Sequence, residues 1–90
     1  MIRPDWLAKT IEAPLEPELP IVDPHHHLWD MDPESWGRYL PDDLLADTTA
    51  GHRIVGTVFV DCQTMYRESG PEALRPVGET EYVESVANRF

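Results

Sequence analysis

Three consecutive histidines, His25, His26 and His27, are the residues of this chain best placed to do chemistry. If residues 20–27 form a β-strand, side chains alternate between its two faces, so His25 and His27 share one face and His26 points to the other. Two imidazoles about 6.6 Å apart along a strand can each place one nitrogen about 2.0–2.1 Å from a single metal ion. The spacing therefore predicts that these nitrogens lie within about 3–4 Å of each other. It supplies only half of a catalytic zinc site, which generally has three or more protein ligands.

A surface cluster of histidines, able to hold a metal fortuitously, is the alternative interpretation of this triplet. The short apolar run at 20–22 favours a strand end instead. His26, on the opposite strand face, is expected to be packed or hydrogen-bonded rather than to bind metal. His52 follows a glycine and is expected in a solvated turn.

The elements around the histidines can be predicted from local sequence patterns. Residues 28–41 read as a loop, in which Trp29, Trp36 and Tyr39 either pin the chain by packing, the favoured interpretation, or wall a substrate pocket. A short helix is expected over 41–49, because proline suits the first helical position and the acidic residues after it complement the helix dipole.

Residues 53–62 form a near-continuous β-branched run, which is typical of a strand covered on both faces in a parallel sheet. A long connection over 63–77 follows, with a helical turn at 71–75, and residues 78–90 have the apolar spacing of a helix. The order strand, helix, strand, helix predicts the opening βαβα segment of a parallel α/β fold. Two parallel strands do not make a self-sufficient sheet, so we expect this chain to be the N-terminal portion of something larger.

The composition limits the classes of partner and compartment. The chain has 90 residues, with 7 Lys and Arg against 17 Asp and Glu, and its formal net charge is −10. This acidic balance argues against nucleic acid and anionic membranes as partners. No apolar run approaches the roughly 18 residues of a membrane helix, and a single cysteine fits a reducing cytoplasm. Residues 1–19 are interrupted by prolines and predict an extended or irregular leader, which is either anchored by Trp6 and Leu7 or frayed.

The segment at 23–30, Asp-Pro-His-His-His-Leu-Trp-Asp, resembles the N-terminal signature of the amidohydrolase superfamily. It is most similar to the amidohydrolase-related branch of (β/α)8-barrel hydrolases, lactonases and decarboxylases. The stretches at 56–62 and 78–81 resemble the second strand of that branch and the helix after it. The resemblance covers residues 20–90 and implies an incomplete TIM-type barrel, about the first quarter of a typical barrel of about 250 residues. Residues 1–19 then form a proline-rich leader.

The resemblance implies functional roles at the matched positions only. His25 and His27 match the two metal ligands of the family's first strand, and zinc is the expected ion. Asp23 precedes them as the family's acid does, and could orient an imidazole from the same face of the strand. The family's other ligands, and the late-strand aspartate that usually serves as its base, have no counterpart here, so the catalytic residues are unknown.

Residues after the second predicted strand are weaker candidates for the site. Asp61 lines the pocket in one interpretation and caps nearby backbone amides in the other. Arg67 could bind a substrate carboxylate bidentately, although a surface arginine is the commoner explanation. No His or Lys lies close to Cys62 in sequence to lower its pKa, so a reactive thiolate is not expected.

The leading hypothesis is a metal-dependent hydrolase of the amidohydrolase-related type, acting on a cyclic ester, an amide or a related small carbonyl compound. The partial chain is expected to be inactive alone. A non-oxidative decarboxylase of the same branch and a truncated, non-catalytic barrel remnant stay open, as does assembly with a separate chain that supplies the other strands. Unpaired apolar faces at 54–60 and 82–90 predict self-association.

Overall fold

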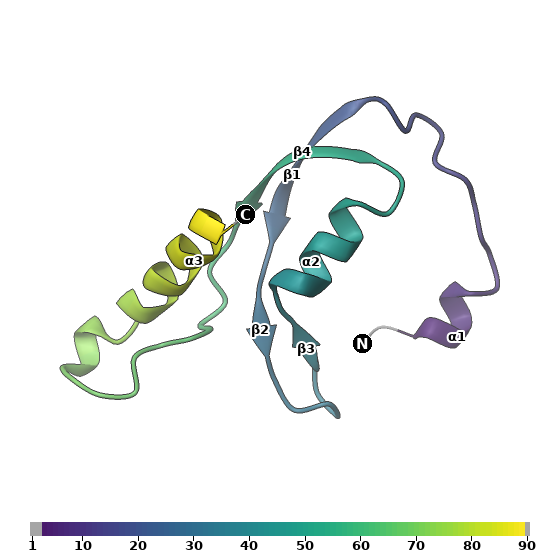
Figure 1. The fold of residues 1–90 in the computed structure, drawn as a ribbon. Coiled ribbons are helices and arrows are strands. Elements are labelled where there is room, and N and C mark those ends of the chain that lie inside the picture. The colour runs from purple at the N-terminus through teal and green to yellow at the C-terminus, as the bar shows by residue number, and fades with distance from the viewer. Residues whose placement is uncertain (1–2, 90) are drawn as a thin grey trace.

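The computed structural model describes residues 3–89, and a pair of parallel strands lies at its centre (Figure 1). No helix in this described part of the chain is long and apolar enough to cross a membrane. In chain order the elements are α1 (Pro4–Leu7), β1 (Pro20–His26), β2 (Trp29–Asp30), β3 (Arg38–Tyr39), α2 (Pro41–Thr48), β4 (Arg53–Phe59), the 3-10 turn η1 (Glu72–Leu74) and α3 (Val77–Arg89).

The two long strands, β1 and β4, pair in parallel, as the order of the predicted elements requires. Helix α2 lies on the connection between them (Figure 1). The register places Asp23 opposite Thr57 and is interrupted between Asp23 and His26. Pro24 lies within this interruption and has no N–H to donate to the ladder. The second of the two register shifts in this pairing therefore falls at Pro24 and His25, close to the end of β1.

The regular elements begin and end close to their predicted limits. The strand predicted over 53–62 ends at Phe59, and the helix predicted over 41–49 ends at Thr48. The helix predicted over 78–90 begins one residue earlier and is observed to Arg89, while Phe90 lies outside the described residues. The helical turn expected at 71–75 is the 3-10 turn η1.

The prediction that residues 28–41 form a loop without regular structure is wrong. The structure contains a short antiparallel hairpin, in which Trp29 pairs with Tyr39 and Asp30 pairs with Arg38. Strands of two residues are too short to carry the alternating pattern by which a strand is recognised in sequence. The hairpin brings Trp29 next to His27.

The leader was predicted to be extended or irregular, and it differs from this only in the single helical turn α1 near its start. Pro4 occupies a starting position of this turn, where its missing N–H is not needed. Trp6 and Leu7 are 62% and 55% exposed. Within the described residues, these side chains therefore do not anchor the leader on the rest of the chain.

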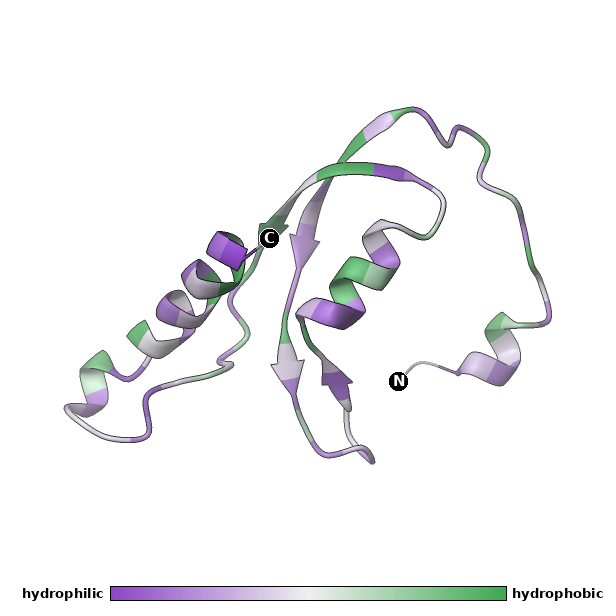
Figure 2. Cartoon of the chain, in the orientation of Figure 1, coloured by the Kyte–Doolittle hydropathy of each residue, from purple (hydrophilic) through white to green (hydrophobic). Residues whose placement is uncertain are grey.

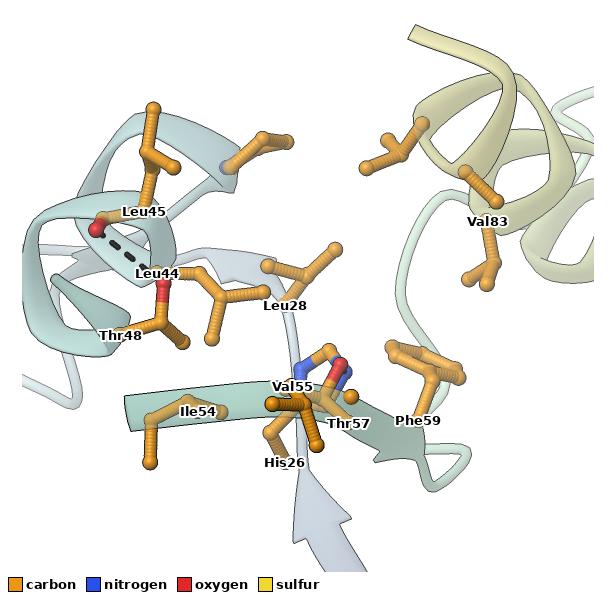
Figure 3. Close-up of a pocket in the computed structure, with 14 residues that line it drawn as sticks. His26, Leu28, Leu44, Leu45, Thr48, Ile54, Val55, Thr57, Phe59 and Val83 are labelled. Carbon is orange, nitrogen blue, oxygen red and sulfur yellow. Dashed lines mark hydrogen bonds between the residues drawn. The ribbon is translucent and has the colours of Figure 1, made fainter. Parts of the chain in front are cut away.

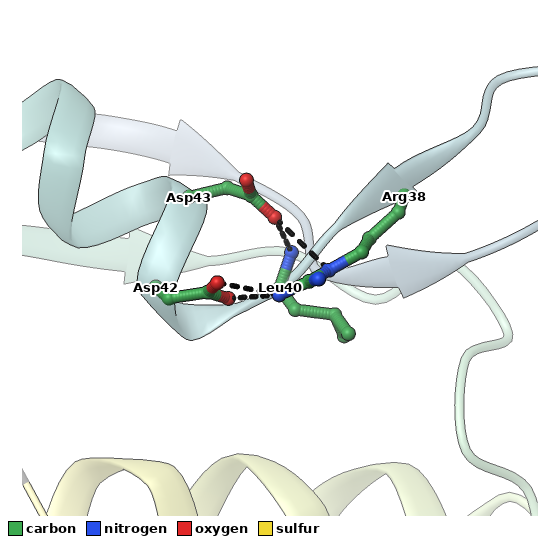
Figure 4. Close-up of polar contacts among 4 residues, drawn as sticks. All are labelled: Arg38, Leu40, Asp42 and Asp43. Carbon is green, nitrogen blue, oxygen red and sulfur yellow. Dashed lines mark hydrogen bonds and ion pairs between the residues drawn. The ribbon is translucent and has the colours of Figure 1, made fainter.

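Polar contacts fasten the start of α2 to β3 (Figure 4). The Asp43 carboxylate accepts a hydrogen bond of 2.9 Å from the Leu40 backbone N–H. The Arg38 guanidinium forms ion pairs with Asp42 at 2.5 Å and with Asp43 at 3.4 Å. These groups are exposed, so water screens the pairs and each adds little stability. Their main effect is to set the direction in which α2 leaves the hairpin.

An open groove lies between α2, α3 and β4, where the apolar side chains of these elements face one another (Figure 3). Its volume is about 410 Å³, and Leu28, which is only 1% exposed, lies within it. Apolar residues are concentrated along β4 and in the middle of α2 (Figure 2). The groove is lined by apolar side chains that include Leu28, Leu44, Ile54, Phe59, Val83 and Val86. An open groove of this kind leaves apolar surface in contact with water.

Several valines of the two long strands are also uncovered. Val22 and Val55 are each 57% exposed, and Val58 is 49% exposed. Contiguous apolar surface of this kind is unusual on a stable monomer. We therefore expect the purified chain to self-associate, and its sedimentation coefficient to rise with protein concentration.

The double variant Val22→Thr and Val55→Thr keeps β-branched side chains but adds hydroxyl groups to this surface. It should shift the concentration dependence toward the monomer. A wild-type chain that sediments as a monomer at every concentration, with sharp reversible unfolding, would contradict the expectation.

The first turn of α3 packs directly on the loop that follows β4. A β-carbon added at Gly78 would lie 2.5 Å from the carbonyl oxygen of Met65 and 2.6 Å from the amide nitrogen of Arg67. Both of these atoms belong to the backbone and cannot rotate away. Glycine is therefore required at this position by close approach rather than by backbone conformation.

The Gly78→Ala variant should lose about 2 kcal/mol of local stability, because overpacking forces the backbone apart. Amide hydrogen exchange over residues 62–67 should then be roughly thirtyfold faster. Gly56→Ala is the matched control, since a β-carbon there would meet no atom within 4 Å. Equal exchange rates in the two variants would show that the close approach is not maintained in solution.

Candidate functional site

The imidazoles of His25 and His27 converge at the end of β1. Their Nε2 atoms lie 3.0 Å apart, and the two rings meet edge to face with centroids 4.8 Å apart. This separation is at the lower end of the 3–4 Å predicted for two nitrogens facing one ion. Two nitrogens on a tetrahedral zinc ion lie about 3.3–3.4 Å apart, so a shift of a few tenths of an ångström would accommodate the ion.

The protonation of His27 is set by the backbone of the neighbouring strand. Its Nδ1 lies 2.7 Å from the carbonyl oxygen of Val60, just beyond β4. A carbonyl oxygen can only accept a hydrogen bond, so Nδ1 carries the proton and donates it. In the neutral ring the Nε2 lone pair of His27 then accepts a hydrogen bond of 3.0 Å from the Nε2–H of His25. A histidine that binds metal through Nε2 usually has this arrangement on its other nitrogen.

His26 points away from this pair, as strand alternation predicts. Its Nε2 lies 3.1 Å from the hydroxyl oxygen of Thr57, and its ring packs against Phe59 with centroids 5.7 Å apart. His26 lines the apolar groove, whereas His25 and His27 do not. The apolar groove therefore lies on the other side of β1 from the two imidazoles.

One aromatic residue of the hairpin, Trp29, packs beside the histidine pair. The indole of Trp29 stacks on the His27 ring at 5.7 Å between centroids and 25° between planes. Trp36 lies 6.2 Å from Trp29 and is 62% exposed. The packing interpretation of this segment accounts for Trp29, which restricts the orientation of the His27 ring.

The two predicted acids make different contacts from those expected. Oδ1 of Asp23 accepts a hydrogen bond of 3.1 Å from the backbone N–H of His25, so it restrains the strand rather than an imidazole ring. Asp61 is exposed. The amides of Cys62 and Thr64, which it was a candidate to cap, are bound by another carboxylate.

Arg67 forms a surface ion pair. Its Nε lies 2.7 Å from Oε1 of Glu81, and both side chains are about half exposed. This hydrogen bond raises the pKa of Arg67 and lowers that of Glu81. The commoner explanation for this residue, a surface arginine, matches the contact seen. Binding of a substrate carboxylate would require Arg67 to leave Glu81.

Glu79 is the residue of this region whose role sequence reasoning missed. It lies in the first turn of α3, where a carboxylate complements the helix dipole, and it is 5% exposed. Its Oε2 accepts hydrogen bonds from the backbone N–H of Cys62 at 2.9 Å and of Thr64 at 3.0 Å. These partners lie 17 and 15 residues earlier in the chain, so no local pattern links them. The sequence gives one indication of this role, namely that Glu79 directly follows Gly78, a glycine at which α3 approaches the backbone of Met65 and Arg67.

The fit of these residues to a metal ion is partial. Two imidazole nitrogens converge, joined by a hydrogen bond, and the His27 ring is held in the tautomer whose Nε2 carries a lone pair. Within residues 3–89, however, no group of three or more His, Cys, Asp or Glu side chains is placed to hold an ion. The arrangement therefore offers two of the ligands that a catalytic zinc site needs.

Comparison of the chain with protein-family models, with curated proteins and with solved structures gives no match. The relationship to the amidohydrolase-related branch accordingly stays a prediction from the motif at 23–30.

Cys62 has the environment of an unreactive thiol. Burial, followed by the nearby negative charge of Glu79, raises its pKa above the ordinary cysteine value. The Sγ also donates a hydrogen bond of 3.4 Å to the carbonyl oxygen of Leu28.

A raised pKa means less thiolate at any pH below it, so iodoacetamide should alkylate Cys62 slowly near pH 8. The rate measured by mass spectrometry should be lower in the folded chain than in the same chain in concentrated urea. Faster alkylation in the folded state would contradict this environment.

Proposed function

We propose that this chain supplies the first two metal ligands, His25 and His27, of a metal-dependent hydrolase of the amidohydrolase-related type. The observation that carries the proposal is the convergence of the two Nε2 atoms to 3.0 Å at the end of β1. A divalent ion, with zinc the expected one, would supply Lewis acidity toward a substrate carbonyl and would activate a water molecule. The proposed substrate is a cyclic ester, an amide or a related small carbonyl compound.

The surroundings of the pair support ligand roles over a fortuitous cluster. The carbonyl of Val60 holds the His27 proton on Nδ1, and the Trp29 ring restricts the plane of the imidazole. A solvated cluster on a flexible tail would have neither restraint. The position of the pair after a parallel strand is also where active sites of α/β proteins lie.

The shortage of ligands favours a second candidate, a chain that binds metal weakly and has no activity by itself. Only two nitrogens converge within the described residues. In this form of the proposal, turnover requires ligands and a base supplied from elsewhere in a barrel. The two candidates share the same metal ligands and differ in whether the metal-loaded chain hydrolyses a substrate.

The test is calorimetric titration of the metal-free chain with Zn²⁺, supported by the visible spectrum of the Co²⁺ form. We expect His25→Ala and His27→Ala each to weaken binding by at least about tenfold, because each variant removes one of two nitrogen ligands. His52→Ala is the matched control, since His52 is an exposed histidine far from the pair in sequence. Unchanged affinity in both His25→Ala and His27→Ala would overturn the proposed site.

A hydrolysis assay with a simple lactone separates the two candidates. Turnover that requires added Zn²⁺ and disappears in His27→Ala would establish an enzyme in this chain alone. Zinc binding without turnover is the result expected from the two-ligand geometry.

A further inference from the structure

The buried carboxylate of Glu79 fixes the loop that follows β4. Glu79 lies in the first turn of α3 and is 5% exposed, and its Oε2 accepts the N–H groups of Cys62 and Thr64 at 2.9 and 3.0 Å. A buried carboxylate is costly unless such donors satisfy it. Thr64 is itself only 7% exposed, so its amide could not turn to water instead. The acid and the two amides therefore hold each other in place.

The opposite side of the same loop is bound to β1. The Val60 N–H donates a hydrogen bond of 2.8 Å to the carbonyl of His26, and the Val60 carbonyl accepts one of 2.7 Å from Nδ1 of His27. The thiol of Cys62 adds a contact of 3.4 Å to the Leu28 carbonyl. The backbone from Val60 to Thr64 is thus held between the histidine strand and the buried acid of α3.

The loop does not hold this shape by its own conformational preference. Gln63 and Met65 adopt left-handed backbone angles, with φ of 65° and 54°, which side chains disfavour. Such angles persist only where surrounding contacts impose them. Glu79 supplies two of these contacts, and the close approach of Gly78 to the Met65 carbonyl supplies packing.

We infer that Glu79 is a positioning residue for the histidine pair. By holding the loop, it keeps the Val60 carbonyl where that oxygen retains the His27 proton on Nδ1. The Nε2 lone pair of His27 is then directed toward His25. The consequence for metal affinity rests on the proposed function, whereas the consequence for the His27 tautomer does not.

The experiment compares Glu79→Ala with Glu84→Ala, an exposed acid of the same helix, in the full chain. The first readout is the tautomer of His27 in the metal-free protein, from the nitrogen chemical shifts of its imidazole. Wild type and Glu84→Ala should show the proton on Nδ1, and Glu79→Ala should shift the ring toward the Nε2-protonated form. The second readout is Zn²⁺ affinity, which should fall about tenfold in Glu79→Ala only, as for other indirect ligand partners.

Two conservative variants separate positioning from general loss of structure. Glu79→Gln keeps an acceptor oxygen of the same reach and should restore the wild-type tautomer. Glu79→Asp keeps the charge but withdraws the oxygen by one methylene, and it should reproduce the tautomer shift even if Glu79→Ala does not fold.

The outcomes distinguish this inference from the proposed function. An unchanged His27 tautomer in folded Glu79→Ala or Glu79→Asp would overturn the positioning role, whatever the metal affinity. A shifted tautomer in a chain whose wild-type form binds no Zn²⁺ would support the positioning role and overturn the metal site.

Discussion

The peptide group of Val60 is the point on which the fold and the candidate site both depend. Its N–H closes the last hydrogen bond between the two parallel strands, to the carbonyl of His26. Its carbonyl accepts the Nδ1 proton of His27. Strand pairing and imidazole orientation are therefore consequences of one backbone position. A displacement of Val60 by even 1 Å would stretch both hydrogen bonds beyond their effective range.

The elements around this peptide act mainly by restraining it. On one side, β1 binds it directly, and the hairpin places Trp29 against the His27 ring. On the other side, Glu79 holds the loop that continues from Val60, through two backbone amides. The restraints come from three separate parts of the chain, and each is short-range and directional.

Much of the apolar surface of the central strands is exposed to water. Leu28 is fully buried, yet Val22 and Val55 remain more than half exposed on the central strands. Parallel strands are normally covered on both faces, because their β-branched side chains are apolar throughout. The sheet therefore leaves apolar surface in contact with water, and the proposed metal site has only two converging nitrogens within the described residues.

The sequence alone determined the order of the long elements, the pairing direction of the two strands, and the sharing of one face by His25 and His27. These follow from patterns with local periods, namely strand alternation and the spacing of apolar residues in helices. Only the tertiary structure decided the hairpin at Trp29–Tyr39, the tautomer of His27, and the burial of Glu79. The strands of the hairpin are too short to show an alternating pattern. The other two features depend on partners distant in sequence, since Val60 lies 33 residues from His27 and Cys62 lies 17 from Glu79. A hydrogen bond between residues so far apart produces no local pattern in the sequence, so its partners are identified only from the folded structure.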